Sequence, residues 1–148
     1  MRAIIQRVNK AQVFVRDSLV SQIQKGLLVF VGFKKGESQD SLLKASSKIV
    51  NLRIFEDVQG KFNLSLRDVE GEVLCVSQFT LYADIRKGRR PSFEEAETPL
   101  KAHELYDTFC KLLENQGVRV ERGIFGERMN VVLENWGPVT IILDTDYL

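Results

Sequence analysis

The 148-residue sequence contains one histidine, two cysteines and three prolines, and neither sign of charge dominates it. With a single histidine and no Cys-x-x-Cys pair, it lacks the usual ligands of a zinc site. A formal net charge of +1 argues against a protein that coats nucleic acid by charge alone. No apolar run approaches the roughly 20 residues of a membrane helix. We therefore expect no metal site and no membrane partner.

The scarcity of histidine also limits the catalytic chemistry. On a helical wheel His103 lies about 110° from the apolar stripe of its predicted helix, so it should face solvent or the rim. A Ser-His-Asp or Cys-His triad is therefore not expected. Cys75 and Cys110 lie in apolar segments, which favours buried free thiols and a cytoplasmic location.

Composition and pattern predict an α+β fold with two helices. Apolar residues make up 44% and charged residues 28% of the chain, as in an ordinary globular protein, and we expect one domain over residues 1–148. Helical spacing and end signals predict helices over about 38–50 and 99–116. We expect mixed or antiparallel sheets, packed or curled into a barrel-like core, with both helices on one side in β-β-α layers.

Strand-like segments lie before, between and after the two helices. The opening segments read as an antiparallel meander, and GEVLCVSQFTLY reads as a central strand because it is apolar on both faces. Three closing strands are expected in VRVERGIF, RMNVVLEN and PVTIILDT. The opening strands are predicted over 2–16, 19–24 and 27–33.

The segment SQFTLY, Ser77 to Tyr82, ends the central strand and leads into a long polar loop. One interpretation is a strand end whose hydroxyl and amide groups cap the backbone. The other is a site, in which backbone N–H groups near Phe79 and Thr80 form an oxyanion pocket while Ser77, Gln78 or Thr80 places the substrate. Thr80 as a nucleophile would need a base, and the sequence offers no clear one.

The following segment, IRKGRRP, concentrates four cations around a glycine. Such a run is commonly just a solvated surface. Next to a candidate site it is equally consistent with phosphate binding. The four side chains are Arg86, Lys87, Arg89 and Arg90.

The segment NWGPVT places a Gly-Pro pair against the last predicted strand, where proline gives up a ladder hydrogen bond. The simple interpretation is a turn with a trans proline. Alternatively, a cis peptide between Gly137 and Pro138 would set two carbonyl groups side by side with no glycine side chain to obstruct approach. Those carbonyls could accept hydrogen bonds from an ammonium group while crowding one face of its α-carbon.

Five segments together closely resemble the D-aminoacyl-tRNA deacylase family, in order and over essentially the whole chain. They are MRAIIQRV, SQFTLYAD, KGRRPSF, GIFGERMNVVLEN and GPVTIILD. The resemblance implies a cofactor-free homodimer that hydrolyses the ester of D-aminoacyl-tRNA, and of glycine mischarged on tRNA(Ala), while rejecting L-aminoacyl-tRNA. The 2′-OH of the RNA would assist the attack, with the protein supplying position and electrostatics.

The resemblance also implies roles for particular residues. Ser77, Gln78, Phe79 and Thr80 match the SQxT motif that lines the pocket for the 3′-terminal adenosine and its ester. Gly137 and Pro138 match a Gly-cisPro motif that reaches into the partner subunit's pocket and rejects L-amino acids. The remaining matches are Arg7, which would hold the Gly-Pro carbonyls, and the pocket-forming Phe125, Gly126 and Met129.

One departure and two alternatives accompany this interpretation. Trp136 stands where the family commonly has Asp, which affects the local support of the Gly-Pro pair and the neighbouring dimer contact. One alternative is a non-catalytic nucleic-acid-binding module that uses residues 85–91. The other is a hydrolase that uses Thr80 directly on a small ester or amide.

Overall fold

A long, bent β-hairpin forms the centre of the computed structural model, which describes all 148 residues. Strand β1 (Arg2–Val15) pairs with β2 (Ser18–Ile23) along its second half and with β3 (Gly26–Gly32) along its first half. The pairs Ala11↔Ile23 and Val8↔Gly26 continue one antiparallel register, so β2 and β3 lie end to end along the same side of β1. The predicted meander is wrong, because it would require β2 to pair with β3.

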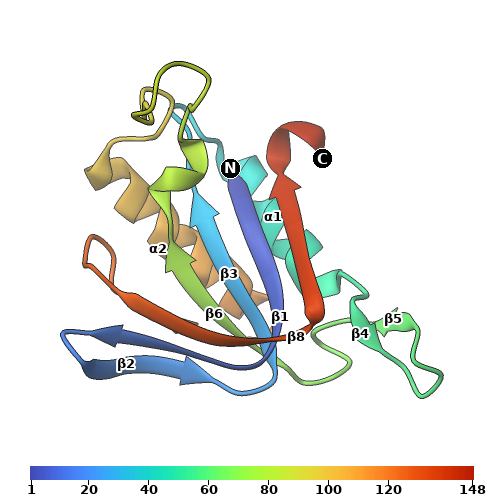
Figure 1. Cartoon of the computed structure of the whole chain (residues 1–148). Coiled ribbons are helices and arrows are strands. Elements are labelled where there is room, and N and C mark those ends of the chain that lie inside the picture. The colour runs from blue at the N-terminus through green and yellow to red at the C-terminus, as the bar shows by residue number, and fades with distance from the viewer.

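The other half of the sheet is parallel. Strand β6 (Glu72–Ser77) pairs in parallel with β3, and β7 (Arg119–Arg122) pairs in parallel with β6. Parallel neighbours need a crossover, and here α1 (Gln39–Asn51) and α2 (Pro99–Asn115) provide the two crossovers. Both helices pack against each other on the same side of the sheet (Figure 1). The predicted α+β fold with a curled mixed sheet and two helices on one side is confirmed.

The two central strands are buried on both faces, which explains their continuous apolar sequence. On β3 and β6, alternate side chains pack toward the helices, and the others pack into the curl formed with β1 and β2. Val29 and Cys75 belong to the larger, helix-side core, whereas Leu28 and Leu74 belong to the smaller one. Cys75 and Cys110 are buried free thiols, as predicted.

The helix ends follow the sequence signals. Ser38 caps α1, its Oγ accepting the N–H of Ser41 at 3.1 Å. Pro99 opens α2, and Gly117 follows its end with a φ of 87°. No helix is both long and apolar enough to span a bilayer. The remaining short elements are β4 (Phe55–Glu56), β5 (Phe62–Leu64), η1 (Phe79–Tyr82) and η2 (Thr145–Tyr147).

The chain closes with two strands where three were predicted, because RMNVVLEN and PVTIILDT form one strand, β8 (Asn130–Asp144). It pairs with β1 as Asn135↔Val8 and then as Thr140↔Gln6, so the four residues 136–139 lie opposite the single residue Arg7. These four residues are called the Gly137-Pro138 bulge below. A bulge is where a strand can hold a proline, since the extra residues leave the ladder.

Candidate active site and the Gly137-Pro138 bulge

A cavity of about 790 Å³ opens where β6 ends and the chain turns into η1. Its walls come from four segments that are far apart in sequence, and nine of its 17 lining residues are hydrophobic. An apolar recess with a few polar groups is the usual form of a small-ligand site. The main wall segments are residues 32–33, 76–79, 96–99 and 125–127.

The predicted SQFT residues are split between the inside and the outside of this cavity. Ser77, Gln78 and Phe79 line it, whereas Thr80 lies outside it on η1 and is exposed. The Gln78 side-chain amide donates to the Thr80 hydroxyl. The predicted strand therefore ends earlier than expected: the last ladder bond runs from Gln78 N–H to the Val31 carbonyl at 2.7 Å, and η1 follows.

The change from strand to η1 frees two backbone donors. The first bond of η1 runs from Leu81 N–H to the Gln78 carbonyl at 3.2 Å. The N–H groups of Phe79 and Thr80 precede it, and the first N–H groups of a helical turn have no acceptor within the turn. Two donors are thus available beside the cavity for an acceptor on a ligand.

The opposite wall carries the GIFGERM segment. Phe125, Gly126 and Met129 all line the cavity, as predicted for a pocket-forming segment. The ring of His103 stacks on Phe125 with centroids 4.5 Å apart and planes 3° apart. His103 is half exposed, so it lies at the rim and fixes the outer face of this wall. This position agrees with the wheel, which put His103 off the buried stripe.

The four cations of the basic loop, residues 85–91, differ in their environment. Arg86 makes three hydrogen bonds to the Asp84 carboxylate, which lower the pKa of Asp84 to about 2. The backbone of Asp84 also pairs with Ser92 in both directions, at 2.8 and 2.9 Å, which closes the base of the loop. The cations with no carboxylate within 4.0 Å are Lys87, Arg89 and Arg90.

The Gly137-Pro138 bulge exposes bare backbone. Gly137 and Pro138 are both exposed and the peptide between them is cis. Gly137 has a φ of 146°, and a Cβ there would lie 2.7 Å from both the backbone nitrogen and the Cγ2 of Val139. Only glycine fits this position.

Asn135 closes the bulge, a role that was not predicted from the sequence. Its Oδ1 accepts the N–H of Val139 at 2.8 Å, and its Nδ2 donates to the Val139 carbonyl at 3.1 Å. A second bond from Nδ2 reaches the Thr140 hydroxyl, also at 3.1 Å. The side-chain amide thus replaces ladder bonds that the extra residues remove. The signal in the sequence was an asparagine two residues before a glycine inside a strand.

Arg7 supports the bulge from the core side. Its side chain is 1% exposed, and its Nε donates to the Trp136 carbonyl at 2.8 Å while Nη1 donates to the Ile54 carbonyl at 2.9 Å. The resemblance implied that Arg7 holds the carbonyls of Gly137 and Pro138. The acceptor in the structure is instead the carbonyl of the residue just before them, and Nη2 lies 3.3 Å from where a Gly137 Cβ would be.

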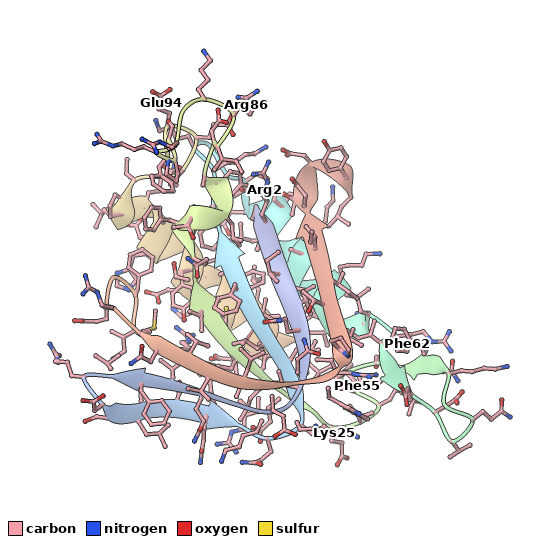
Figure 2. The ribbon with its side chains drawn as sticks, in the orientation of Figure 1. Arg2, Lys25, Phe55, Phe62, Arg86 and Glu94 are labelled. Carbon is pink, nitrogen blue, oxygen red and sulfur yellow. The ribbon has the colours of Figure 1, made fainter.

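Trp136 contributes its ring to the same support. The Arg7 guanidinium lies over it, 4.2 Å from its centroid, and Lys25 Nζ lies 5.5 Å from the same centroid. Phe55 packs nearby, and Phe62 contacts Arg7 from the β4–β5 hairpin. Figure 2 shows Lys25, Phe55 and Phe62 gathered around the bend of β8. The ring therefore holds Arg7 by cation–π contact.

Within this chain the cavity and the bulge are separate. The bulge lies opposite Arg7, whereas η1 lies beside Arg2, whose Nη1 donates to the Leu81 carbonyl at 3.0 Å. None of residues 135–140 lines the cavity. The bulge therefore lies outside the cavity of its own chain.

Comparison with known proteins assigns the chain to a family. Residues 4–144 match the model of the D-Tyr-tRNA(Tyr) deacylase family. The chain belongs to this family. A D-aminoacyl-tRNA deacylase of Aquifex aeolicus (strain VF5) is 56% identical over 145 residues, which cover 98% of each chain. The D-aminoacyl-tRNA deacylase of Thermotoga petrophila is 51% identical over 148 residues, which cover 100% of this chain and 99% of the relative.

Two solved structures have a similar fold. One, titled "c-Myc DNA Unwinding Element Binding Protein", has a TM-score of 0.91 and 39% identity, covering 97% of this chain and 98% of that one. A second, described as a probable eukaryotic D-amino acid tRNA deacylase, has a TM-score of 0.84 and 22% identity, covering 96% and 97%. The second likeness shows the shared fold.

Proposed function

We propose that the chain hydrolyses the ester bond of D-aminoacyl-tRNA in the cavity beside Ser77 and Gln78. Membership in the deacylase family supports the reaction, which makes the protein a hydrolase. The observation that carries the placement is the cavity itself, because it gathers Ser77, Gln78 and Phe79 and residues of the GIFGERM segment around one apolar recess. Such a recess suits the terminal adenosine and its ester, with backbone groups as the polar contacts.

The proposed chemistry uses donors of the main chain and a hydroxyl of the substrate. Water adds to the ester carbonyl with help from the vicinal 2′-OH of the terminal ribose. The N–H groups of Phe79 and Thr80 donate to the oxyanion that forms. The intermediate then collapses, the ribose 3′-oxygen leaves and takes up a proton, and free D-amino acid and tRNA are released. No side-chain nucleophile is required.

The Gly137-Pro138 bulge is proposed to reject L-amino acids in the cavity of a second copy. Its exposure supports this role, and its distance from its own cavity means that any cavity it meets belongs to another chain. Backbone carbonyls would bind the substrate ammonium, and the adjacent surface would collide with any L side chain. We therefore propose a homodimer whose active sites lie at the interface, with Arg7 orienting the bulge through the Trp136 carbonyl.

This arrangement extends the proposed substrate range to glycine. Glycine has no side chain, so nothing in it would collide with the bulge, and glycyl-tRNA(Ala) would be cleaved along with D-aminoacyl-tRNA. Because tRNA is the substrate, we propose that the protein works in the cytoplasm. We also propose that residues 1–148 form a single deacylase domain. Chiral proofreading of this kind would return mischarged tRNA to the charging reaction.

The basic loop is proposed to contact tRNA phosphates. Lys87, Arg89 and Arg90 are exposed and have no carboxylate partner, so their charge is available to an anion. Arg86 has a structural role at the loop base, where it is held by Asp84. Its own contribution to phosphate binding is therefore expected to be the smallest of the four.

The test of this chemistry is a substrate without the assisting hydroxyl. A D-aminoacyl-tRNA whose terminal ribose lacks the 2′-OH should bind with similar affinity and be cleaved at least about a hundredfold more slowly, since positioned proton transfer contributes that much. Single-turnover rates with both substrates measure the ratio. Equal rates would refute assistance by the RNA.

A second candidate function is that of a non-catalytic nucleic-acid-binding module. It rests on the three unpaired cations of the basic loop. Deacylation assays with matched D- and L-aminoacyl-tRNA separate the two. The module would bind both substrates and cleave neither. A hydrolase that used Thr80 on small esters would cleave without preferring tRNA.

A further inference from the structure

Two aromatic side chains stand exposed at the mouth of the cavity. Phe79 is 55% exposed and Phe93 is 37% exposed, and their rings meet edge to face with centroids 4.9 Å apart. Both residues line the cavity, although their side chains also face the solvent. Paired exposed aromatic rings are costly on a surface with no partner, so they point to a binding surface.

Phe93 is held in place on both sides. Before it, Ser92 pairs with Asp84 in both directions. After it, Ala96 N–H donates to the Phe93 carbonyl at 3.1 Å, and Glu97 N–H donates to the Phe33 carbonyl at 3.0 Å. Residues 85–91 lie between the paired Asp84 and Ser92, and Phe93 follows directly after this closure. The pair is therefore preorganised, which lowers the entropy cost of binding a flat ligand.

Charge around the pair differs on its two sides. The unpaired cations Lys87, Arg89 and Arg90 precede Phe93 in the loop, and the exposed Glu94 and Glu95 follow it. Figure 2 shows Arg86 and Glu94 on the same protruding segment. A nucleic-acid strand bound here would direct its phosphates toward residues 87–90 and away from the two carboxylates. Aromatic rings beside such cations are the elements that bind single strands.

We propose that Phe79 and Phe93 bind, by stacking, the nucleobase that precedes the terminal adenosine of the aminoacyl-tRNA. The proposal rests on the proposed function, which places the terminal adenosine in the cavity. The next base of the unpaired 3′ end then emerges at the cavity mouth, where the ring pair stands. Stacking tolerates any base, so this subsite would serve all tRNAs and would fix the direction in which the strand leaves the cavity.

The test compares a minimal substrate with one that is a single nucleotide longer. The substrates are D-tyrosyl-adenosine, the D-tyrosyl ester of cytidylyl-adenosine, and D-tyrosyl-tRNA. The variant is Phe93→Ala, with Phe93→Tyr as the variant that keeps a ring. Leu43→Ala, at an exposed leucine on α1, is the control for loss of an exposed apolar side chain. Circular dichroism and the unfolding midpoint check the fold of each protein.

The expected result is a loss that grows when the second nucleotide is added. Because Phe93 also lines the cavity, the decisive quantity is the difference between substrates: Phe93→Ala should lower kcat/KM for the dinucleotide and for tRNA about tenfold more than for D-tyrosyl-adenosine, the usual effect of removing one stacking ring. Phe93→Tyr and Leu43→Ala should resemble the parent protein. Replacing Lys87, Arg89 and Arg90 by Gln should reduce kcat/KM for tRNA most strongly and flatten its salt dependence.

Two results would overturn the subsite. An equal loss on all three substrates would assign Phe93 to the pocket of the terminal adenosine, and no loss on any of them would make the ring pair a bystander. Failure of the parent protein to cleave any substrate would instead contradict the proposed function. The two failures are therefore distinguishable.

Discussion

The backbone beside the cavity and the backbone of the Gly137-Pro138 bulge are fixed in different ways. The cavity grows out of the core: β6 is buried on both faces, and its last ladder bond passes directly into η1. The bulge leaves the ladder, and its conformation depends on two side chains, Arg7 and Asn135, which bond its carbonyls and N–H groups. Backbone at the end of a core strand is fixed by the sheet, whereas backbone that leaves a sheet must be fixed by side chains.

The largest effect is expected at the buried arginine. Arg7→Met should lower the free energy of unfolding by about 3 kcal/mol, because it leaves the Trp136 and Ile54 carbonyls without their donors. Arg2→Met is the matched control. Arg2 is partly exposed and pairs with Asp144, so its loss should cost about 1 kcal/mol or less. Urea unfolding of the two variants measures the difference, and equal losses would contradict the buried support of the bulge.

A smaller effect is expected at the glycine of the bulge. Gly137→Ala should cost about 2 kcal/mol of unfolding free energy, since the new Cβ meets Val139 at 2.7 Å and the φ is unfavourable. It should also lower the ratio of D- to L-aminoacyl-tRNA cleavage at least about tenfold, which corresponds to 1.4 kcal/mol of discrimination.

The matched control for that variant is Gly60→Ala. Gly60 also has a positive φ, 74°, but a Cβ there meets nothing within 4 Å. Gly60→Ala should lower the free energy of unfolding by about 1 kcal/mol and leave the D- over L-selectivity unchanged. If Gly137→Ala behaved in the same way, the close contact within the bulge would not matter.

The smallest effect is expected at Thr80. Its hydroxyl lies outside the cavity and receives one hydrogen bond from Gln78. Thr80→Ala should therefore raise the activation free energy by about 1 kcal/mol, which lowers kcat about fivefold. Single-turnover assays with saturating D-aminoacyl-tRNA measure this. Complete loss of cleavage with unchanged tRNA affinity would make Thr80 a nucleophile.

The same contrast explains how much of the structure could be predicted from the sequence. Periodicity and end signals located both helices, and apolar runs located β3 and β6, because these depend on local pattern. The pairing of β3 with β1 and the fusion of two predicted strands into β8 depend on partners far along the chain. A strand pattern does not specify its neighbour, so the meander and the third closing strand were wrong.

The candidate site was also predicted only in part. Ser77, Gln78, Phe125 and Met129 were predicted and do meet in one cavity. Three contacts were not predicted: Asn135 closes the bulge, the Trp136 carbonyl accepts from Arg7, and the rings of Phe79 and Phe93 pair. These contacts join residues through loops and a bulge, where no periodicity indicates which side chains will meet.

The most direct test of the central claim, that the bulge of one copy controls the cavity of another, is a subunit-mixing experiment. The Gly137→Ala protein is mixed with an excess of a protein that has an inactivated cavity but an intact bulge. Exchange of subunits is confirmed by mass-tagged chains. The account predicts that the inactive protein restores the D- over L-selectivity, because each working cavity of the homodimer then faces an intact bulge. Unchanged selectivity after complete subunit exchange would contradict it.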